Sequence, residues 1–176
     1  MNRAEEIYGR LIAPIEEKMM GIVARIVRDE DEAADVFQEV LATVWAKLAT
    51  IDRHPNPHGY ILRVALSRSY DALRERAARS ARGERALDED MAGPALGGAG
   101  PDGRFEAFVR GAISKLPAKQ AQAVLLRAIE DAPYEGIGSV LGCSAATARS
   151  HFSKGAARLR KILVKMEKRQ EAGGMP

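Results

Sequence analysis

The chain has 176 residues with 27 Lys/Arg and 24 Asp/Glu, a formal net charge of +3, so its length allows one domain or two small ones. Its one cysteine excludes an internal disulfide framework and a cysteine-rich zinc site, and its three histidines lack metal-ligand spacing on a common face. Helix formers dominate and aromatic residues are scarce, which predicts an all-α fold. Without a signal peptide or a long apolar run, we expect a cytoplasmic protein with no membrane partner.

Two amphipathic helices are predicted at the start of the chain. In residues 3–27, apolar side chains share one side, and Pro14 and Gly21 are expected to bend or interrupt the helix. In residues 30–48, Asp35, Gln38 and Glu39 are three and four residues apart, so they can contact a partner together. The opposite side of this helix is a continuous apolar stripe of Val36, Phe37, Val40, Leu41, Val44, Trp45 and Leu48.

A third helix is predicted from about His58 to Arg82, after the break HPNPHG. Tyr60, Ile61, Val64, Ala65 and Leu73 supply its apolar side. Its later turns are basic, with Arg63, Arg68, Arg74, Arg76, Arg79 and Arg82 against only Asp71 and Glu75. The arginine guanidinium can donate two parallel hydrogen bonds to a phosphate, so this helix end suits nucleic acid. A solvated helix end explains the cluster of arginines about as well.

The charge distribution divides the chain into two small helical domains and a linker. Residues 1–82 hold 13 basic and 13 acidic residues, whereas residues 104–176 hold 13 basic and six acidic ones. Between them, residues 83–103 contain six glycines, two prolines and five acids against one arginine, which predicts a flexible acidic linker. The basic C-terminal half suggests a polyanion partner. We expect its domain to span 104–170, followed by a disordered tail at 171–176.

Residues 132–163 predict a helix–turn–helix. Gly142 ends the first helix because glycine adopts the left-handed backbone that the corner needs, and Ser144 is a good N-cap for the second. Gly138 and Ala148 are small where the two helices press closest. Cys143 is expected to plug the corner as a small apolar side chain.

The second helix of this motif is expected to read DNA, with its polar start in the major groove and its cations on phosphates. A common helical hairpin with a solvated basic face is the alternative. The candidate DNA-binding residues are Ser144, Thr147, Arg149, Ser150, His151, Lys154, Arg158 and Lys161.

Three segments together resemble bacterial sigma factors of the extracytoplasmic-function group in the sigma-70 family. DEDEAADVFQEVLATVWAKL resembles the family's polymerase-binding helix, and HGYILRVALSRSYDALRERAAR resembles the next helix, which melts and reads the promoter −10 element. LPAKQAQAVLLRAIEDAPYEGIGSVLGCSAATARSHFSKGAARLRKIL is similar to the C-terminal domain that reads the −35 element. The resemblance covers nearly the whole chain, in the family's order and with its linker.

The resemblance implies roles for individual residues. Asp35, Gln38 and Glu39 match the family's D-x-x-Q-E, which meets the polymerase clamp helices. Asp71, Leu73 and Arg74 match its D-x-L-R, and Ser144, Thr147, Arg149 and Ser150 match the recognition-helix pattern S-x-x-T-x-[KR]-S. The implied −10 residues are Arg63, Ser67, Asp71, Arg74, Arg76 and Arg79.

Four positions depart from the family pattern. Ser67 stands where asparagine is frequent, Tyr60 where tryptophan is usual, Gly136 where glutamate often occurs, and Ala148 replaces a common valine. The promoter sequence is therefore not readable from these residues.

The resemblance implies a transcription initiation factor whose partners are core RNA polymerase, promoter DNA and an anti-sigma protein. We expect no cofactor and no enzymatic activity, since the sequence has no phosphate loop, metal constellation or nucleophile–base pair. Two alternatives stay open. One is a helix–turn–helix regulator that acts without polymerase, and the other is a sigma-like decoy that binds only an anti-sigma protein.

Overall fold

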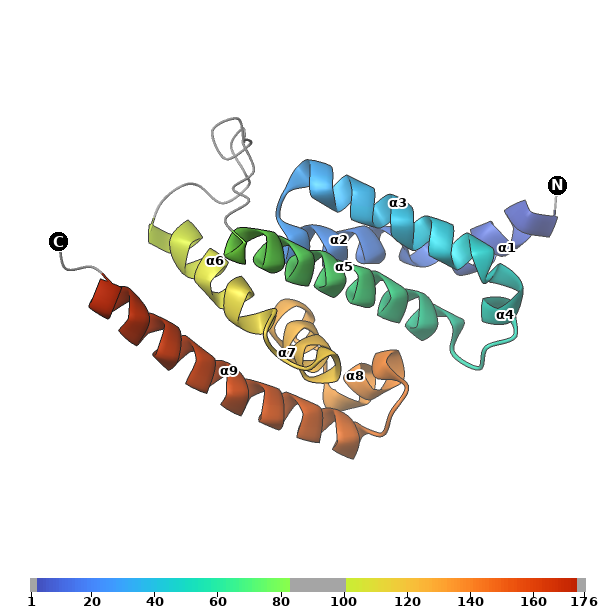
Figure 1. Ribbon diagram of the computed structural model, residues 1–176. Coiled ribbons are helices and arrows are strands. Elements are labelled where there is room, and N and C mark those ends of the chain that lie inside the picture. The colour runs from blue at the N-terminus through green and yellow to red at the C-terminus, as the bar shows by residue number, and fades with distance from the viewer. Residues whose placement is uncertain (1–2, 83–100, 174–176) are drawn as a thin grey trace.

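The computed structural model describes residues 3–82 and 101–173, and these are arranged as packed helices without β-strands (Figure 1). The predicted all-α fold is confirmed. Within the described ranges, no helix combines the length and the apolar character that crossing a membrane requires. In chain order the elements are α1 (Arg3–Leu11), the 3-10 turn η1 (Ala13–Ile15), α2 (Glu16–Val27), α3 (Glu30–Ala46), α4 (Leu48–Asp52), α5 (Pro57–Ala81), α6 (Pro101–Ile113), α7 (Ala118–Glu130), α8 (Tyr134–Leu141) and α9 (Ala145–Gly173).

Local sequence explains where the N-terminal helices begin and end. Pro14 interrupts the helix predicted over 3–27 with the turn η1, because proline lacks the amide hydrogen that a helix interior needs. Gly21 lies inside α2 without breaking it. Arg28 ends α2 in the left-handed conformation, with φ of 68°, and the Asp29 side chain then caps α3 by accepting a hydrogen bond from a backbone amide at 2.8 Å.

Helix α5 lies between the two halves of the fold. It begins where Asn56 accepts a hydrogen bond from the Gly59 amide at 2.9 Å and Pro57 occupies the first turn, where a missing amide hydrogen costs nothing. The helix packs against α2 and α3 and also against α7 and α8 (Figure 1). Its buried residues recur at helical spacing and are Gly59, Ile61, Leu62, Ala65, Leu66, Ser69, Tyr70 and Leu73.

The C-terminal helices extend beyond the predicted domain limits at both ends. Helix α6 begins at Pro101, inside the predicted linker, because proline suits the first turn of a helix. Helix α9 continues to Gly173, inside the predicted tail, because Lys, Met, Glu, Arg and Gln are good helix formers. The rest of the predicted linker and tail, 83–100 and 174–176, lies outside the described residues.

The N-terminal unit (α1–α5) and the C-terminal unit (α6–α9) share one continuous apolar core. Tyr70 of α5 lies at their junction, where its side chain is 1% exposed. Its hydroxyl donates toward the carbonyl oxygens of Leu116 and Ser114, the latter at 3.3 Å. Burial raises the pKa of the Tyr70 phenol, because the charged form would lose its hydration. The sequence had left the arrangement of the two units open, and the structure shows them packed together.

The glycine at position 138 should be needed for the helix–turn–helix to close. A Cβ atom there would lie 2.6 Å from the Cys143 carbonyl oxygen, which is backbone and cannot move aside. Gly138→Ala should therefore destabilise the protein by about 1–3 kcal/mol in urea unfolding. Gly9→Ala is the matched control, since a Cβ there meets nothing within 4 Å, and it should be neutral or stabilising by up to about 1 kcal/mol. Equal effects of the two changes would contradict the close contact.

Tyr70→Phe tests the buried hydroxyl at the junction of the units. At pH 8 it should lower the free energy of unfolding by about 1–3 kcal/mol, because carbonyl acceptors lose their donor. Since the folded pKa of Tyr70 lies above its ordinary value of 10.0, the wild type should be fully stabilised below pH 10 and lose this stability as pH rises further. Tyr60→Phe, at a half-buried ring in the same helix, is the control. A gap between Tyr70→Phe and wild type that stays constant up to pH 11 would contradict the assignment.

Candidate nucleic-acid interface

The predicted helix–turn–helix is formed by α8 and the start of α9. Gly142 ends α8 with φ of 68°, and the Cys143 amide closes the turn by donating to the Gly138 carbonyl at 2.9 Å. The Ser144 hydroxyl caps α9 by accepting from the Thr147 amide at 3.1 Å. These contacts fix the angle at which the start of α9 projects from the C-terminal unit. Cys143 is half-buried against the core, in line with its expected packing role.

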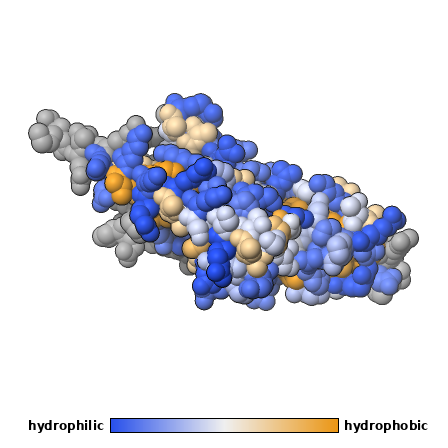
Figure 2. Space-filling model, turned by 90° about the horizontal axis from the view of Figure 1, so that it is seen from below, coloured by the Kyte–Doolittle hydropathy of each residue, from blue (hydrophilic) through white to orange (hydrophobic). Residues whose placement is uncertain are grey.

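The side chains predicted to read DNA are mostly exposed on α9. Thr147, Ser150, Lys154 and Lys161 recur three, four and seven residues apart, so they share the outer side of the helix. Seen from below, the side along which α9 runs is mostly hydrophilic (Figure 2). Exposed positions of the predicted set are Ser144, Thr147, Arg149, Ser150, Lys154, Arg158 and Lys161, whereas His151 is half-buried.

Two arginines of this set already have partners inside the C-terminal unit. Arg158 donates to the Gln120 side chain of α7 at 3.1 Å. The Arg149 guanidinium lies over the ring of Tyr134, 4.9 Å from its centroid. Sequence reasoning missed Tyr134, which starts α8.

The residues predicted to read the −10 element fall on two sides of α5. Arg63 and Ser67 share one side with Tyr70, at helical spacing, and this side faces the C-terminal unit. Arg63 donates to the Leu141 carbonyl at 3.3 Å, and the Gln122 side chain donates to the Ser67 hydroxyl at 3.0 Å. These two predicted DNA-binding residues therefore contact protein in the described arrangement.

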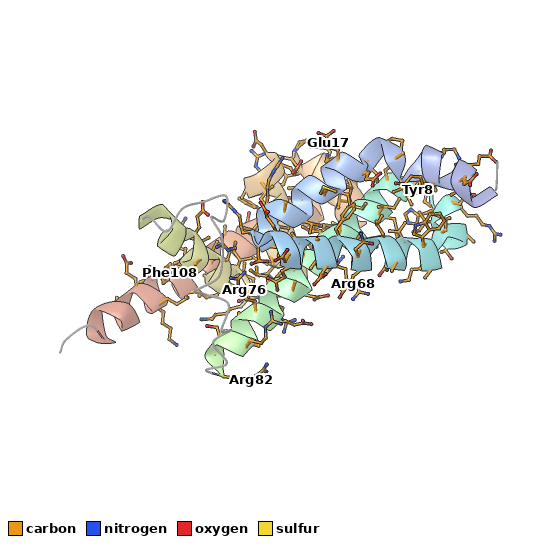
Figure 3. The ribbon with its side chains drawn as sticks, turned by 90° about the horizontal axis from the view of Figure 1, so that it is seen from above. Tyr8, Glu17, Arg68, Arg76, Arg82 and Phe108 are labelled. Atoms are coloured by element: carbon orange, nitrogen blue, oxygen red, sulfur yellow. The ribbon has the colours of Figure 1, made fainter. Side chains whose placement is uncertain are left out.

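The remaining arginines of the −10 set lie toward α3 or solvent. Arg76 and Arg79 pair with Glu32 at 3.4 and 3.3 Å. Figure 3 shows Arg76 where α5 passes α3. Arg74 is exposed with its guanidinium 5.9 Å from the Tyr70 ring centroid, and Asp71 is exposed. The structure thus does not gather the predicted −10 residues into one open surface.

The polar face of α3 is open. Asp35, Gln38 and Glu39 are all exposed, and none of them makes an ion pair within the described part of the chain. Trp45 was predicted in the apolar stripe, but it is 42% exposed and stacks on Tyr8 with ring centroids 5.9 Å apart. It lies seven residues after Gln38, so it borders the polar face rather than the core. An exposed tryptophan beside polar side chains is typical of a protein-binding surface.

Polar contacts at the rim hold the two units together. Asn56 donates to the Ser139 hydroxyl at 2.7 Å, and Arg25 pairs with Glu130 at 2.8 Å. Their partners are 83 and 105 residues apart in the chain, so sequence patterns gave no signal for them.

Comparisons with known proteins match each unit separately. A family profile described as Sigma-70 region 2 matches residues 11–79, and one described as Sigma-70, region 4 matches residues 109–159. RNA polymerase sigma-H factor of Pseudomonas aeruginosa is 26% identical over 171 residues, which cover 89% of this chain and 86% of that protein. RNA polymerase sigma factor CarQ of Myxococcus xanthus is 28% identical over 167 residues, which cover 93% of each protein.

Two solved structures share the fold. One is the sigma factor RpoE in complex with the anti-sigma factor NepR from Bartonella quintana, with a TM-score of 0.51, 20% identity, and coverage of 89% of this chain and 96% of that chain. The other is CnrH in complex with the cytosolic domain of CnrY, with a TM-score of 0.51, 19% identity, and coverage of 90% of this chain and 88% of that chain. With region 2 in its N-terminal unit and region 4 in its C-terminal unit, the two profiles together match more than half of the chain, and the chain belongs to the sigma-70 family of transcription initiation factors.

Proposed function

We propose that this protein binds core RNA polymerase, directs it to promoters by reading −35 and −10 elements, and aids promoter melting. The observation that carries the proposal is the presence of two separate open surfaces on one chain. One is the α3 face of Asp35, Gln38, Glu39 and the adjoining Trp45, and the other is the outer side of α9. A regulator that acts without polymerase would need only the second surface. A decoy would need only the first.

The −35 step is assigned to the capped start of α9. Ser144 and Thr147 sit at the tip, Ser150 and Lys154 follow on the outer side, and these polar groups suit base edges in a major groove. Arg158, Lys161 and His151 lie further from the tip or to its side, where phosphates would flank the helix. This division between base-reading and phosphate-binding residues is the usual one for a recognition helix.

The −10 step is assigned to α5 and requires the units to separate. Because Arg63 and Ser67 contact the C-terminal unit, single-stranded bases can reach them only after that unit has moved away. Captured bases would then offset the cost of unstacking the duplex, so melting is a consequence of binding and needs no catalytic group. Asp71, Arg74, Arg76 and Arg79 would contact the same DNA from the open part of α5.

Core polymerase is assigned to the α3 face, and this role would locate the protein in the cytoplasm with the chromosome. An anti-sigma protein is a further proposed partner, because one solved structure that shares this fold is a complex of a sigma factor with an anti-sigma factor. In these assignments the protein supplies binding, and the polymerase supplies the chemistry.

Reversing the charges on α3 tests the polymerase assignment. Asp35→Lys with Glu39→Lys should change the free energy of unfolding by less than about 0.5 kcal/mol, because both side chains are exposed. It should lower capture of core polymerase by about tenfold or more and abolish run-off transcription. Glu17→Lys with Glu167→Lys makes the same charge change at exposed sites on other helices and should leave capture intact. Normal capture by the α3 variant would exclude this face.

A disulfide between the units tests the −10 assignment. Asn56→Cys with Ser139→Cys, in a Cys143→Ala background, replaces the side chains of a 2.7 Å hydrogen bond across the units. The oxidised protein should fail to give run-off product from promoters that the wild type uses, and a reductant should restore it. Each single cysteine variant controls for loss of the hydrogen bond. Full activity of the oxidised, cross-linked protein would show that the covered side of α5 does not read DNA.

A further inference from the structure

Tyr134 occupies the centre of a small cluster at the start of α8. The Arg149 guanidinium lies 4.9 Å from its ring centroid, within the range of a cation–π contact. The Phe152 ring packs against the same ring at 6.0 Å with a tilt of 58°. Tyr134 and Phe152 are half-buried, whereas Arg149 is exposed. The Tyr134 ring, packed on one side, therefore contacts a guanidinium that lies at the surface.

The turn that carries Tyr134 is itself fixed. Arg127 of α7 donates to the carbonyl oxygens of Asp131 and Ala132 at 3.2 and 3.0 Å, and its guanidinium lies 5.9 Å from the Tyr134 centroid. Asp131 takes the left-handed conformation, with φ of 44°, as the end of α7. Contacts from α7 therefore hold both the turn and the ring within the C-terminal unit.

Arg149 depends on this ring for its orientation. Within the described residues it makes no hydrogen bond and no ion pair, so the ring is its sole specific contact. A free arginine on a helix start samples many rotamers and meets phosphate easily, because phosphate surrounds the groove. A guanidinium held over a ring keeps its N–H groups free at the edge while it loses rotational freedom.

We propose that Tyr134 is a positioning residue that aims Arg149 at a guanine in the −35 element. Arginine reads guanine through two parallel hydrogen bonds to O6 and N7, a contact that requires a fixed guanidinium plane. The proposal rests on the −35 role of α9 and adds a residue outside the recognition helix to its specificity. It requires the aromatic ring of Tyr134 and not its hydroxyl.

The test is selection from DNA with a randomised upstream element by the full-length protein bound to core polymerase. Wild type and Tyr134→Phe should enrich the same element. Arg149→Ala should lose preference for one guanine by about tenfold, which corresponds to about 1.4 kcal/mol. Tyr134→Leu should lose preference at that same base pair and keep preferences elsewhere. In the Arg149→Ala background, Tyr134→Leu should change base preference no further.

Other outcomes separate the two claims. If the wild type enriches no element, the −35 role of α9 is excluded, and the positioning role of Tyr134 is excluded as well. If wild type enriches an element and Tyr134→Leu keeps the guanine preference, only the positioning role is excluded. A uniform loss of affinity in Tyr134→Leu, with a salt slope smaller by about one, would instead place Arg149 on phosphate and overturn the proposal. Lys161→Ala should show that uniform pattern and serves as its reference.

Discussion

The burial of α5 from two directions is the constraint on which the rest of the arrangement depends. Helices α2 and α3 pack on one side of it and α7 and α8 on another. Tyr70 shows what this means for a single side chain, since its ring is almost fully buried and its hydroxyl reaches carbonyls of the C-terminal unit. The two units therefore share a core. The same packing places Arg63 and Ser67, which lie on Tyr70's side of the helix, against the C-terminal unit.

The polar contacts around this shared core are weak enough to be exchanged. In the pair between Arg25 and Glu130, the arginine side chain is 56% exposed, and Arg76 and Arg79 are about as exposed where they pair with Glu32. Pairs with so exposed an arginine contribute only about 0–1 kcal/mol each, because water already solvates the guanidinium. DNA phosphates or an acidic protein surface could replace these carboxylates at little cost. Stability of the packed arrangement thus comes from apolar burial, while the charged side chains stay available to partners.

The sequence predicted those features that depend on single residues and their near neighbours. The break at Pro14, the corner at Gly142 and the cap at Ser144 follow from backbone chemistry, and apolar spacing located the long helices. Trp45 was predicted in the apolar stripe because the spacing of apolar residues along a helix does not distinguish the edge of its buried side from the centre. The contact of α5 with the C-terminal unit was not predictable either. Arg63 donates to the Leu141 carbonyl, 78 residues away in the chain, and no local sequence pattern indicates such a pair.

Gly142 links the two proposed DNA-reading elements in the packed arrangement. Its φ of 68° closes the helix–turn–helix, and a left-handed backbone costs other residues roughly 1–2 kcal/mol. A Cβ atom at Gly142 would also lie 2.5 Å from the Arg63 guanidinium, so α5 docks directly against the corner. Arg63 could swing away from a larger side chain, but it would then lose the Leu141 carbonyl. The corner that orients α9 is therefore also part of the surface that covers α5. Any change that reshapes this corner should alter the exposure of the proposed −10 residues together with the angle of the proposed −35 helix.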